Sequence, residues 1–512
     1  MERLTFNIGT SRGGRIVVAG PDDGPTAPAQ TTTHGSSTLS RAKHQIRAVR
    51  ERYDTDYLFM LAFTALLFFR PQDHIPGVGA LHLAELTAIG GLAAMAVRRL
   101  SAGQTIAHVN GEVVAVIALG AVIVLTLPFS FWPGGSLTVF SDIYVKVILI
   151  FALMMSTITS PRRVQQMTWI MIIASGYIAS RAVFDYVRGV NLIEGNRVRG
   201  SVGGMFENPN DLALNLVTFL APTLFIIFQE KRASRRLFAS AIAAAMLAAI
   251  VCTKSRSGFL GLIAMAAIVL YYMAQKKPAI VVGVILAAFM ALPVMPSSFW
   301  DRMDSIVNAD EDTSGSRAAR LRLFDQGIEV FLENPVTGIG AGQFQNYTGP
   351  GMVEKWRVTH NVWLQVAAEL GIFGLMIFAF MVLRAYTSSL AALRMLRASA
   401  PKRGAGTSEG RWGNSQRPSH PQSRPPSAIR HVQYELSAED RRLLDINAKG
   451  MIAAMVGWTI CSMFASVAFN WTFYYVFALA VAGRDILLAR RVASEAPAVN
   501  KSRIANLVRV TA

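Results

Sequence analysis

The sequence contains few charged residues and almost no cysteine. Asp, Glu, Lys and Arg together make up only 16% of the 512 residues, whereas about a quarter is usual in soluble proteins. Hydrophobic residues reach 52%, so this composition argues against a water-soluble enzyme. The only cysteines, Cys252 and Cys461, both lie in apolar runs. They cannot form a disulfide framework or a zinc site, and we expect small buried side chains at both positions.

The charged residues that are present are mostly basic. There are 50 Lys and Arg residues against 32 Asp and Glu, which gives a formal net charge of +18. Such a charge is common in proteins that bind nucleic acid, but a membrane protein can also hold excess cations in its cytoplasmic loops. The positions of the cations along the chain distinguish these two explanations.

Apolar runs of bilayer-spanning length predict twelve membrane spans. Residues 1–56 precede them, are polar and contain no apolar signal-peptide core, so we expect no cleavable signal and a first span that acts as the anchor. The spans lie near residues 57–69, 81–97, 112–128, 138–157, 165–184, 210–228, 237–253, 257–274, 278–296, 362–386, 448–468 and 470–488.

The cations follow the alternation expected of such a chain. With a cytoplasmic N-terminus, roughly 36 of the 50 cations fall on the cytoplasmic side and about 13 outside, as the positive-inside rule requires. Lys146 alone is left within a span. We therefore predict an all-α polytopic membrane protein with about 12 transmembrane helices and both termini in the cytoplasm. Its charge is explained by the lipid bilayer and requires no nucleic acid.

Two long connections interrupt the short loops. Residues 297–361 form an outer loop before the tenth span, and the apolar spacing of Leu321, Phe324, Ile328 and Phe331 predicts an amphipathic helix on the membrane face. Residues 387–447 form a cytoplasmic loop that we expect to be disordered, because it is rich in Pro, Ser, Gly and Arg. The predicted organisation is a cytoplasmic tail (1–56), spans 1–9 (57–296), the outer loop (297–361), span 10 (362–386), the cytoplasmic loop (387–447), spans 11–12 (448–488) and a second cytoplasmic tail (489–512).

The few cations on the outer side are the most informative ones. Arg256 lies in the short turn 253–258 between two apolar runs, where a guanidinium is expected to have a partner. Arg197 and Arg199 lie in a glycine-rich outer loop, whose backbone amides can add to an anion site. Arginine forks bind phosphate oxygens through paired hydrogen bonds, so these residues predict a diphosphate site. The alternative is that they reach lipid headgroups or pair with acidic residues of the same loop.

A histidine opens the tenth span. His360 lies between Thr359 and Asn361, and an imidazole can accept a proton from a hydroxyl at neutral pH. The alternative is an ordinary residue of the membrane interface. Asn208-Pro-Asn210 is a helix-start signal before the sixth span. The glycines at 338, 340 and 342 predict a tight loop, since no Lys-Ser/Thr follows them.

Several separated motifs occur in the order found in one family. They are Arg199 with the sequence FENPN at 206–210, Ser-Arg-Ser at 255–257, Arg320 ahead of PVTGIG at 335–340, and His360-Asn361 with ELG at 369–371. Over residues 190–480 the chain resembles the O-antigen ligase family, which also contains polysaccharide polymerases and protein O-glycosylation ligases. FRPQD at 69–73 is similar to the exosortase-associated variant of that family. The insert at 398–440 is not part of the family pattern.

The resemblance implies an inner-membrane glycosyltransferase that works on its periplasmic side. Such enzymes move a glycan from a polyprenyl diphosphate carrier to a hydroxyl of a lipid, a protein or a growing glycan. By motif, Arg199 and Arg256 would bind the diphosphate and stabilise it as it leaves, and Arg320 would help them from the amphipathic helix. His360 would be the general base. Supporting roles would fall to Asn210, Asn361 and Glu369. The resemblance implies inversion at the anomeric carbon, no metal and no cofactor.

Three alternatives to a ligase remain at this stage. A polymerase of the same family would use the same arginines and histidine and differ in its acceptor pocket. A lipid-linked glycan transporter would be expected to show two related halves, and none is visible. A metal-dependent glycosyltransferase needs an acidic pair on the outer side, for which Asp301 and Asp304 are the candidates.

Overall fold

The computed structural model describes most of the chain beyond its first segment. Two compact units are distinguished, Met1–Asp54 and Thr55–Ala512, and the account below concerns the second. The predictions placed on the N-terminal tail, on Asp301 and Asp304, on residues 400–435 and on the tail after 495 lie outside the described residues. The described residues are 54–73, 75–193, 196–201, 206–294, 300, 316–348, 357–399 and 436–495.

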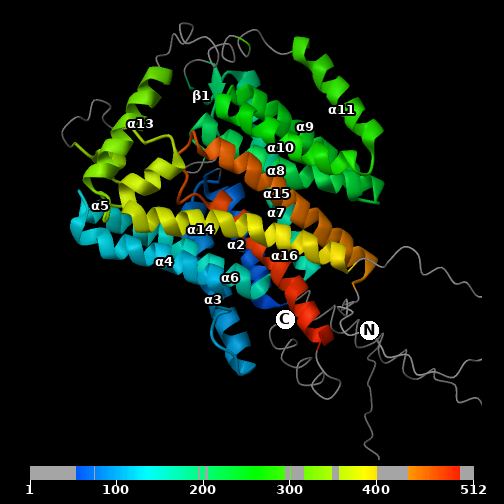
Figure 1. The fold of residues 1–512 in the computed structure, drawn as a ribbon, viewed down its shortest axis with the longest axis horizontal. Coiled ribbons are helices and arrows are strands. Elements are labelled where there is room, and N and C mark those ends of the chain that lie inside the picture. Colours follow the sequence, from blue (N-terminus) through cyan, green and yellow to red (C-terminus); the bar gives the residue numbers. More distant parts are fainter. Residues whose placement is uncertain are drawn as a thin grey trace, which may run out of the picture. The chain divides into compact units, whose positions relative to one another are not determined.

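The described residues are almost entirely helical (Figure 1). The only strands among them, β1 (Leu192–Ile193) and β2 (Arg197–Val198), pair in an antiparallel hairpin. A π-helical turn at Val139–Tyr144 joins α5 to α6. The helices are α2 (Thr55–Phe69), α3 (Leu83–Ser101), α4 (Gly111–Thr126), α5 (Pro133–Thr138), α6 (Val145–Thr157), α7 (Pro161–Arg188), α8 (Pro209–Gln229), α9 (Ala233–Thr253), α10 (Arg256–Ala274), α11 (Pro278–Ala291), α13 (Ser316–Glu333), α14 (Val362–Ala398), α15 (Ala438–Ser462) and α16 (Trp471–Glu495).

Each predicted span overlaps a helix or, for the fourth span, the continuous run from α5 to α6. The eleventh span was placed too far along the chain, because α15 ends at Ser462 rather than at residue 468. Nine helices among the described residues are long and apolar enough to cross a membrane. The three remaining predicted spans correspond to α2, α11 and α15. The first two have only 15 and 14 residues, so they rise about 22 Å, which is short of a hydrocarbon core of about 30 Å. An all-α polytopic membrane protein is confirmed.

Helix starts are fixed by local side chains. Asn208 caps α8 by accepting a hydrogen bond from the backbone N–H of Asn210, and Pro209 is the first helical residue, as the sequence predicts. Ser160 and Asn110 cap α7 and α4 in the same manner. These contacts give hydrogen-bond acceptors to backbone N–H groups at the helix starts, which have no partner within the helix and would find none in lipid.

Helix α15 forms the centre of the packing, because it lies against α8, α10 and α14. Small residues permit the close crossing of α10 and α15: a methyl group added at Gly261 would lie 3.0 Å from the carbonyl oxygen of Gly457 and would overlap Cys461. Cys461 is buried and Cys252 is half-buried, and both are free thiols. The expectation that they are packing residues is confirmed.

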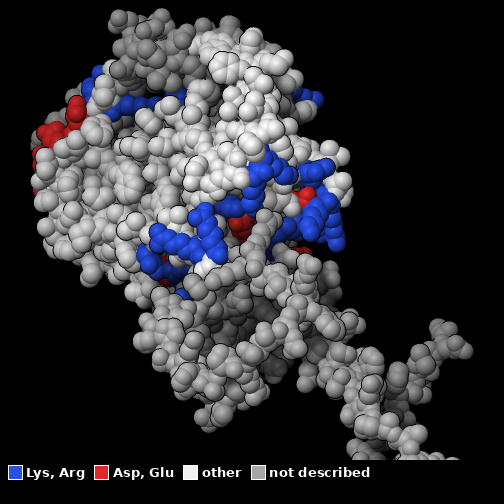
Figure 2. Space-filling model, turned by 45° about the vertical axis from the view of Figure 1, so that its right-hand side comes forward, with Lys and Arg blue, Asp and Glu red and all other residues white. Residues whose placement is uncertain are grey.

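Helix ends that the sequence assigns to the cytoplasm meet at one end of the bundle. Arg98 at the end of α3 lies 2.7 Å from Asp56 at the start of α2 and donates to the carbonyl of Ser156 at the end of α6. Arg442 at the start of α15 lies 3.2 Å from Glu230, which follows α8. Figure 2 shows Lys and Arg gathered in a band beside a wide uncharged area.

The outer loop contains the predicted helix, but a different face packs against the protein. In α13, Ala319, Leu323 and Val330 are buried, whereas Leu321 and Phe324 of the predicted stripe remain 58% and 44% exposed. The stripe is therefore available to the bilayer or to a ligand. Two other boundaries differ: α14 continues as a helix to residue 398 and α15 begins at residue 438, both within the segment predicted to be a disordered loop.

Candidate active site

One cavity brings together residues from four distant parts of the chain. It has a volume of about 380 Å³ and is lined by Arg256 at the start of α10, Arg320 in α13, and His360 and Asn361 before α14. We call it the Arg–His cavity. Its remaining wall is mostly apolar and includes Leu260, Leu321, Phe324, Met463 and Phe464. Among the described residues that line it, none is acidic.

Arg256 is held by the turn between α9 and α10. Ser255 caps α10 by accepting from the backbone N–H of Gly258, and its hydroxyl lies 3.0 Å from that of Ser257. Lys254 ends α9 in the left-handed region with φ of 47°. This tight turn makes Arg256 the first residue of α10, so its guanidinium is carried at a helix N-terminus beside the cavity.

Asn210, at the start of α8, is hydrogen-bonded to this turn. Its side-chain oxygen accepts hydrogen bonds from the hydroxyl of Ser255 at 2.7 Å and from the guanidinium of Arg197 at 3.1 Å. Arg197 also donates to the carbonyl of Thr253 at 3.2 Å and is only 5% exposed. Asn210 and Arg197 thus connect the glycine-rich loop to the turn that carries Arg256. Neither lines the Arg–His cavity.

Arg199 occupies a different environment from Arg197. It follows strand β2, its side chain is exposed, and its backbone N–H donates to the carbonyl of Asn191. It is not among the residues that line the Arg–His cavity. Its contact with a diphosphate stays a prediction.

His360 is held by its backbone in an unusual conformation. Its φ is 49°, in the left-handed region that non-glycine residues seldom adopt. Its N–H donates to the hydroxyl of Ser466 at 3.0 Å, and the same hydroxyl lies 2.9 Å from that of Thr359. Burial of His360, together with the positive charges of Arg320 and Arg357, lowers the pKa of its imidazole from 6.5 to about 4. The ring is therefore neutral at physiological pH and able to accept a proton.

Asn361 fixes the start of α14 directly after this histidine. Its side-chain oxygen accepts from the backbone N–H groups of Trp363 and Leu364 at 3.0 and 3.2 Å. Asn361 lines the cavity while its oxygen is used for capping. Its structural role is to hold His360 at the beginning of a rigid helix.

Glu369 lies away from the cavity and holds the loop that follows α13. It is buried, and its carboxylate accepts from the backbone N–H of Gly342 at 2.8 Å. The backbone of α14 is interrupted at Gly371, which has φ of 64°. The N–H groups of Ile339 and Gly340 bind the carbonyls of Ala368 and Glu369 beside this interruption. The glycine run thus forms the predicted tight loop, inserted at a kink of α14.

This loop connects α13 to α14. Gly327 of α13 packs so closely on Leu364 of α14 that a larger side chain would overlap it. The hydroxyl of Ser130 also contacts the carbonyl of Ile339, which attaches the α4–α5 connection to the same loop. These contacts determine where Arg320 lies relative to His360.

Several residues of the site have no recognisable motif in the sequence. Ser466, Met463 and Phe464 belong to the short connection between α15 and α16, which has no catalytic motif. Ser466 positions the backbone of His360, and the other two form part of the apolar wall. Only the folding of α15 against α10 and α14 brings this connection to the cavity.

Comparison with known families supports the resemblance seen in the motifs. Residues 241–379 match the O-antigen ligase family model. In this segment the chain is similar to the O-antigen ligase family. The matched segment contains Arg256, Arg320 and His360, whereas Arg199 and Asn210 precede it. A search of curated proteins gave no match to the chain.

The matched segment supports a class of activity. A segment similar to the O-antigen ligase family, in a chain with several helices able to span a membrane, supports a multi-pass membrane protein of the glycosyltransferase or ligase type. The Arg–His cavity contains the matched arginines and histidine and is the candidate for the reaction.

Proposed function

We propose that the protein is a ligase that transfers a glycan from a polyprenyl diphosphate carrier to an acceptor hydroxyl. The observation that carries this proposal is the shared cavity of Arg256, Arg320 and His360. These three residues lie far apart in the sequence and belong to three different elements. A donor with a diphosphate and an acceptor with a hydroxyl need both positive charge and a base, and this cavity contains both.

The two arginines suit the donor. Their positive charge at the cavity favours a diphosphate, and it favours the leaving diphosphate more strongly as negative charge develops on it. Guanidinium forks bind phosphate oxygens in pairs, so the arginines replace a divalent metal in this proposal. The apolar wall formed by Leu260, Phe324 and Phe464 suits the first isoprene units of the carrier.

His360 is the proposed general base. Its neutral ring takes the proton of the acceptor hydroxyl while the acceptor oxygen forms a bond to the anomeric carbon. The bond from that carbon to the diphosphate oxygen breaks, and its electron pair leaves with the diphosphate. Attack from the side opposite the leaving group inverts the anomeric carbon. The neutral state of the ring at physiological pH and its fixed backbone position both support this role for His360.

We place the reaction on the periplasmic face of a bacterial inner membrane. Arg98, Arg235 and Arg442 lie at or near helix ends that the sequence assigns to the cytoplasm, whereas Arg256 and His360 of the Arg–His cavity lie at helix starts assigned to the outer side. This orientation puts both termini in the cytoplasm. Arg199, on an exposed loop of the same outer side, would contact the diphosphate only if the loop closes over bound donor.

The glycan phenotype of a deletion strain tests the proposal. For a ligase we expect long glycan chains that remain unattached to any acceptor, and normal conjugates after the gene is restored. Single repeat units that remain on the carrier or reach the acceptor would instead identify a polymerase. An unchanged glycan profile would exclude both activities.

A further inference from the structure

A second cavity lies at the other end of the bundle. Its volume is about 460 Å³, and it is formed by the start of α4, the middle of α14 and the end of α16. Helix α14 joins the two cavities. An unbroken helix from Val362 to Arg384 would rise about 33 Å, so α14 with its kink at Gly371 spans up to that length, against a hydrocarbon thickness of about 30 Å. The two cavities therefore lie near opposite surfaces of the membrane. We call the second one the ion-pair cavity, after Glu112, Arg384 and Arg484.

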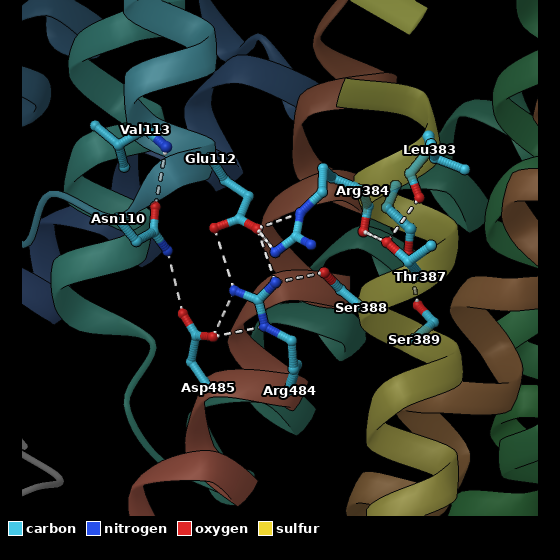
Figure 3. Close-up of polar contacts among 11 residues, drawn as sticks. Asn110, Glu112, Val113, Leu383, Arg384, Thr387, Ser388, Ser389, Arg484 and Asp485 are labelled. Carbon is cyan, nitrogen blue, oxygen red and sulfur yellow. Dashed lines mark hydrogen bonds and ion pairs between the residues drawn. The ribbon is translucent and has the colours of Figure 1, made fainter. Parts of the chain in front are cut away.

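Its wall is an ordered network of charged side chains (Figure 3). Glu112, only 2% exposed, lies between Arg384 and Arg484 and accepts hydrogen bonds from both guanidinium groups. Arg484 also donates to Asp485 at 2.8 Å, and Asn110 donates to the other oxygen of Asp485 at 3.1 Å. The network joins α4, α14 and α16 through two arginines and two carboxylates, so its formal charge is balanced.

Two members of the network retain binding capacity on the cavity side. Arg384 uses Nε and Nη2 for Glu112, and its Nη1 makes no hydrogen bond to any residue that the structure describes. The side chain of Arg384 is 36% exposed and that of Asp485 is 27% exposed. A ligand in this cavity would therefore meet one cationic donor and one anionic acceptor, both held in place by their neighbours.

The rim of the cavity is apolar. Phe380 of α14 and Leu488 of α16 both line it and remain 46% and 41% exposed. Both residues lie on candidate membrane-spanning helices, where large exposed apolar side chains are expected to face acyl chains. The cavity thus combines a polar interior at the membrane interface with a hydrocarbon-facing edge.

We propose that the ion-pair cavity binds the headgroup of a phospholipid that has both a phosphate and a primary ammonium, such as phosphatidylethanolamine. Arg384 binds the phosphate, Asp485 accepts a hydrogen bond from the ammonium, and the acyl chains lie along Phe380 and Leu488. The balanced charge favours a zwitterion, because a purely anionic headgroup would meet Asp485 as well as Arg384. A quaternary ammonium lacks the N–H that the carboxylate needs.

Lipid binding to the purified wild-type protein tests this directly. Detergent-solubilised protein is mixed with equal amounts of phosphatidylethanolamine, phosphatidylglycerol and phosphatidylcholine, and bound lipids are counted by native mass spectrometry. We expect one phosphatidylethanolamine to bind about tenfold more tightly than either other lipid, the effect of one charge-assisted hydrogen bond. Equal binding of all three lipids, or tighter binding of phosphatidylglycerol, would overturn the proposal.

Three variants locate the site. Asp485→Asn should abolish the preference for phosphatidylethanolamine over phosphatidylcholine, and Arg384→Gln should weaken binding of both. Arg394→Gln is the matched control, because Arg394 is an exposed arginine of the same helix that does not line the cavity. Loss of the preference in Arg394→Gln, or its retention in Asp485→Asn, contradicts the assignment. If Arg384→Gln does not fold, the proposal is still tested by the lipid preference of the wild-type protein and by the loss of that preference in Asp485→Asn.

Discussion

The two ends of the helix bundle use arginine in opposite ways. In the ion-pair cavity, Arg384 and Arg484 surround the carboxylate of Glu112, and every positive charge has a negative neighbour. In the Arg–His cavity, Arg256 and Arg320 share the lining with His360, and none of the described lining residues is acidic. The same side chain therefore joins helices at one end and lines a cavity beside a histidine at the other.

The difference follows from the cost of burying charge. A carboxylate beside an arginine satisfies its hydrogen bonds and stabilises the arrangement, and losing one partner leaves a charge without compensation. A site for an anion needs positively charged groups that the ligand can reach and that favour the developing negative charge. Replacing an arginine of the ion-pair cavity should therefore lower the stability of the protein, whereas replacing one of the Arg–His cavity should lower the rate of glycan transfer.

Replacement of His360 by Ala should have the largest effect. Without the base, the acceptor hydroxyl keeps its proton during attack, so we expect transfer to fall by about a hundredfold or more. Glycan transfer is measured with purified protein in proteoliposomes and by complementation of a deletion strain. His82→Ala, at an exposed histidine, is the control and should transfer normally. Restoration of surface glycan by His360→Ala would remove the histidine from the mechanism.

Arg256→Ala should lower transfer by about a hundredfold, because one of two charges that stabilise the leaving diphosphate is lost. Arg256→Lys keeps the charge but not the paired hydrogen bonds, so it should recover only part of the rate. Arg188→Ala is the matched control at an exposed arginine at the end of α7. Both active-site variants should still insert into the membrane. Equal rates in Arg256→Ala and Arg188→Ala would contradict the diphosphate assignment.

At the other end, Glu112→Gln should reduce stability rather than catalysis. It leaves Arg384 and Arg484 facing a neutral amide, and breaking a buried pair typically costs about 3 kcal/mol. Thermal unfolding in detergent should show a Tm lower by several degrees. Glu85→Gln breaks an exposed pair with Lys146 and should leave Tm unchanged. A Tm equal to that of the wild type would show that the network does not hold α4, α14 and α16 together.

The pH profile provides a further test of the Arg–His cavity. Because burial and Arg320 lower the pKa of His360 to about 4, the free enzyme keeps a neutral imidazole down to that pH. We expect kcat/KM to be constant from about pH 8 to pH 5.5 and to decline only as the pH approaches 4. An ordinary histidine would cause the decline near pH 6.5. A half-maximal kcat/KM at that pH would contradict the environment described for His360.

Chelation should have the smallest effect of all. If the arginines alone stabilise the leaving diphosphate, transfer in excess EDTA should equal transfer in its absence. The measurement uses the same proteoliposomes, with magnesium added back as the control. Loss of transfer that magnesium restores would favour a metal-dependent enzyme.

Much of the fold followed from the sequence, because membrane helices are specified by local properties. Apolar length, basic helix ends and capping residues such as Asn208 act between neighbours along the chain, and helices appear where these signals predict them. The outer-loop helix was predicted for the same reason. Its packing face was not, because the predicted stripe at Leu321 and Phe324 borders the cavity while Leu323 and Val330 bury the helix.

The sequence also supplied the motif residues of the candidate site, but not their arrangement. It could not distinguish Arg197 from Arg199, two residues apart, of which one is buried against Asn210 and the other is exposed. It gave no indication that Ser466 would hold His360, or that Glu112 would join two arginines from other helices. By itself, the sequence determined which segments form apolar helices and which residue types lie at the ends of those helices. Only the packing of α10, α13, α14 and α15 decided which of them meet, because such contacts join residues that are distant along the chain and have no local signal.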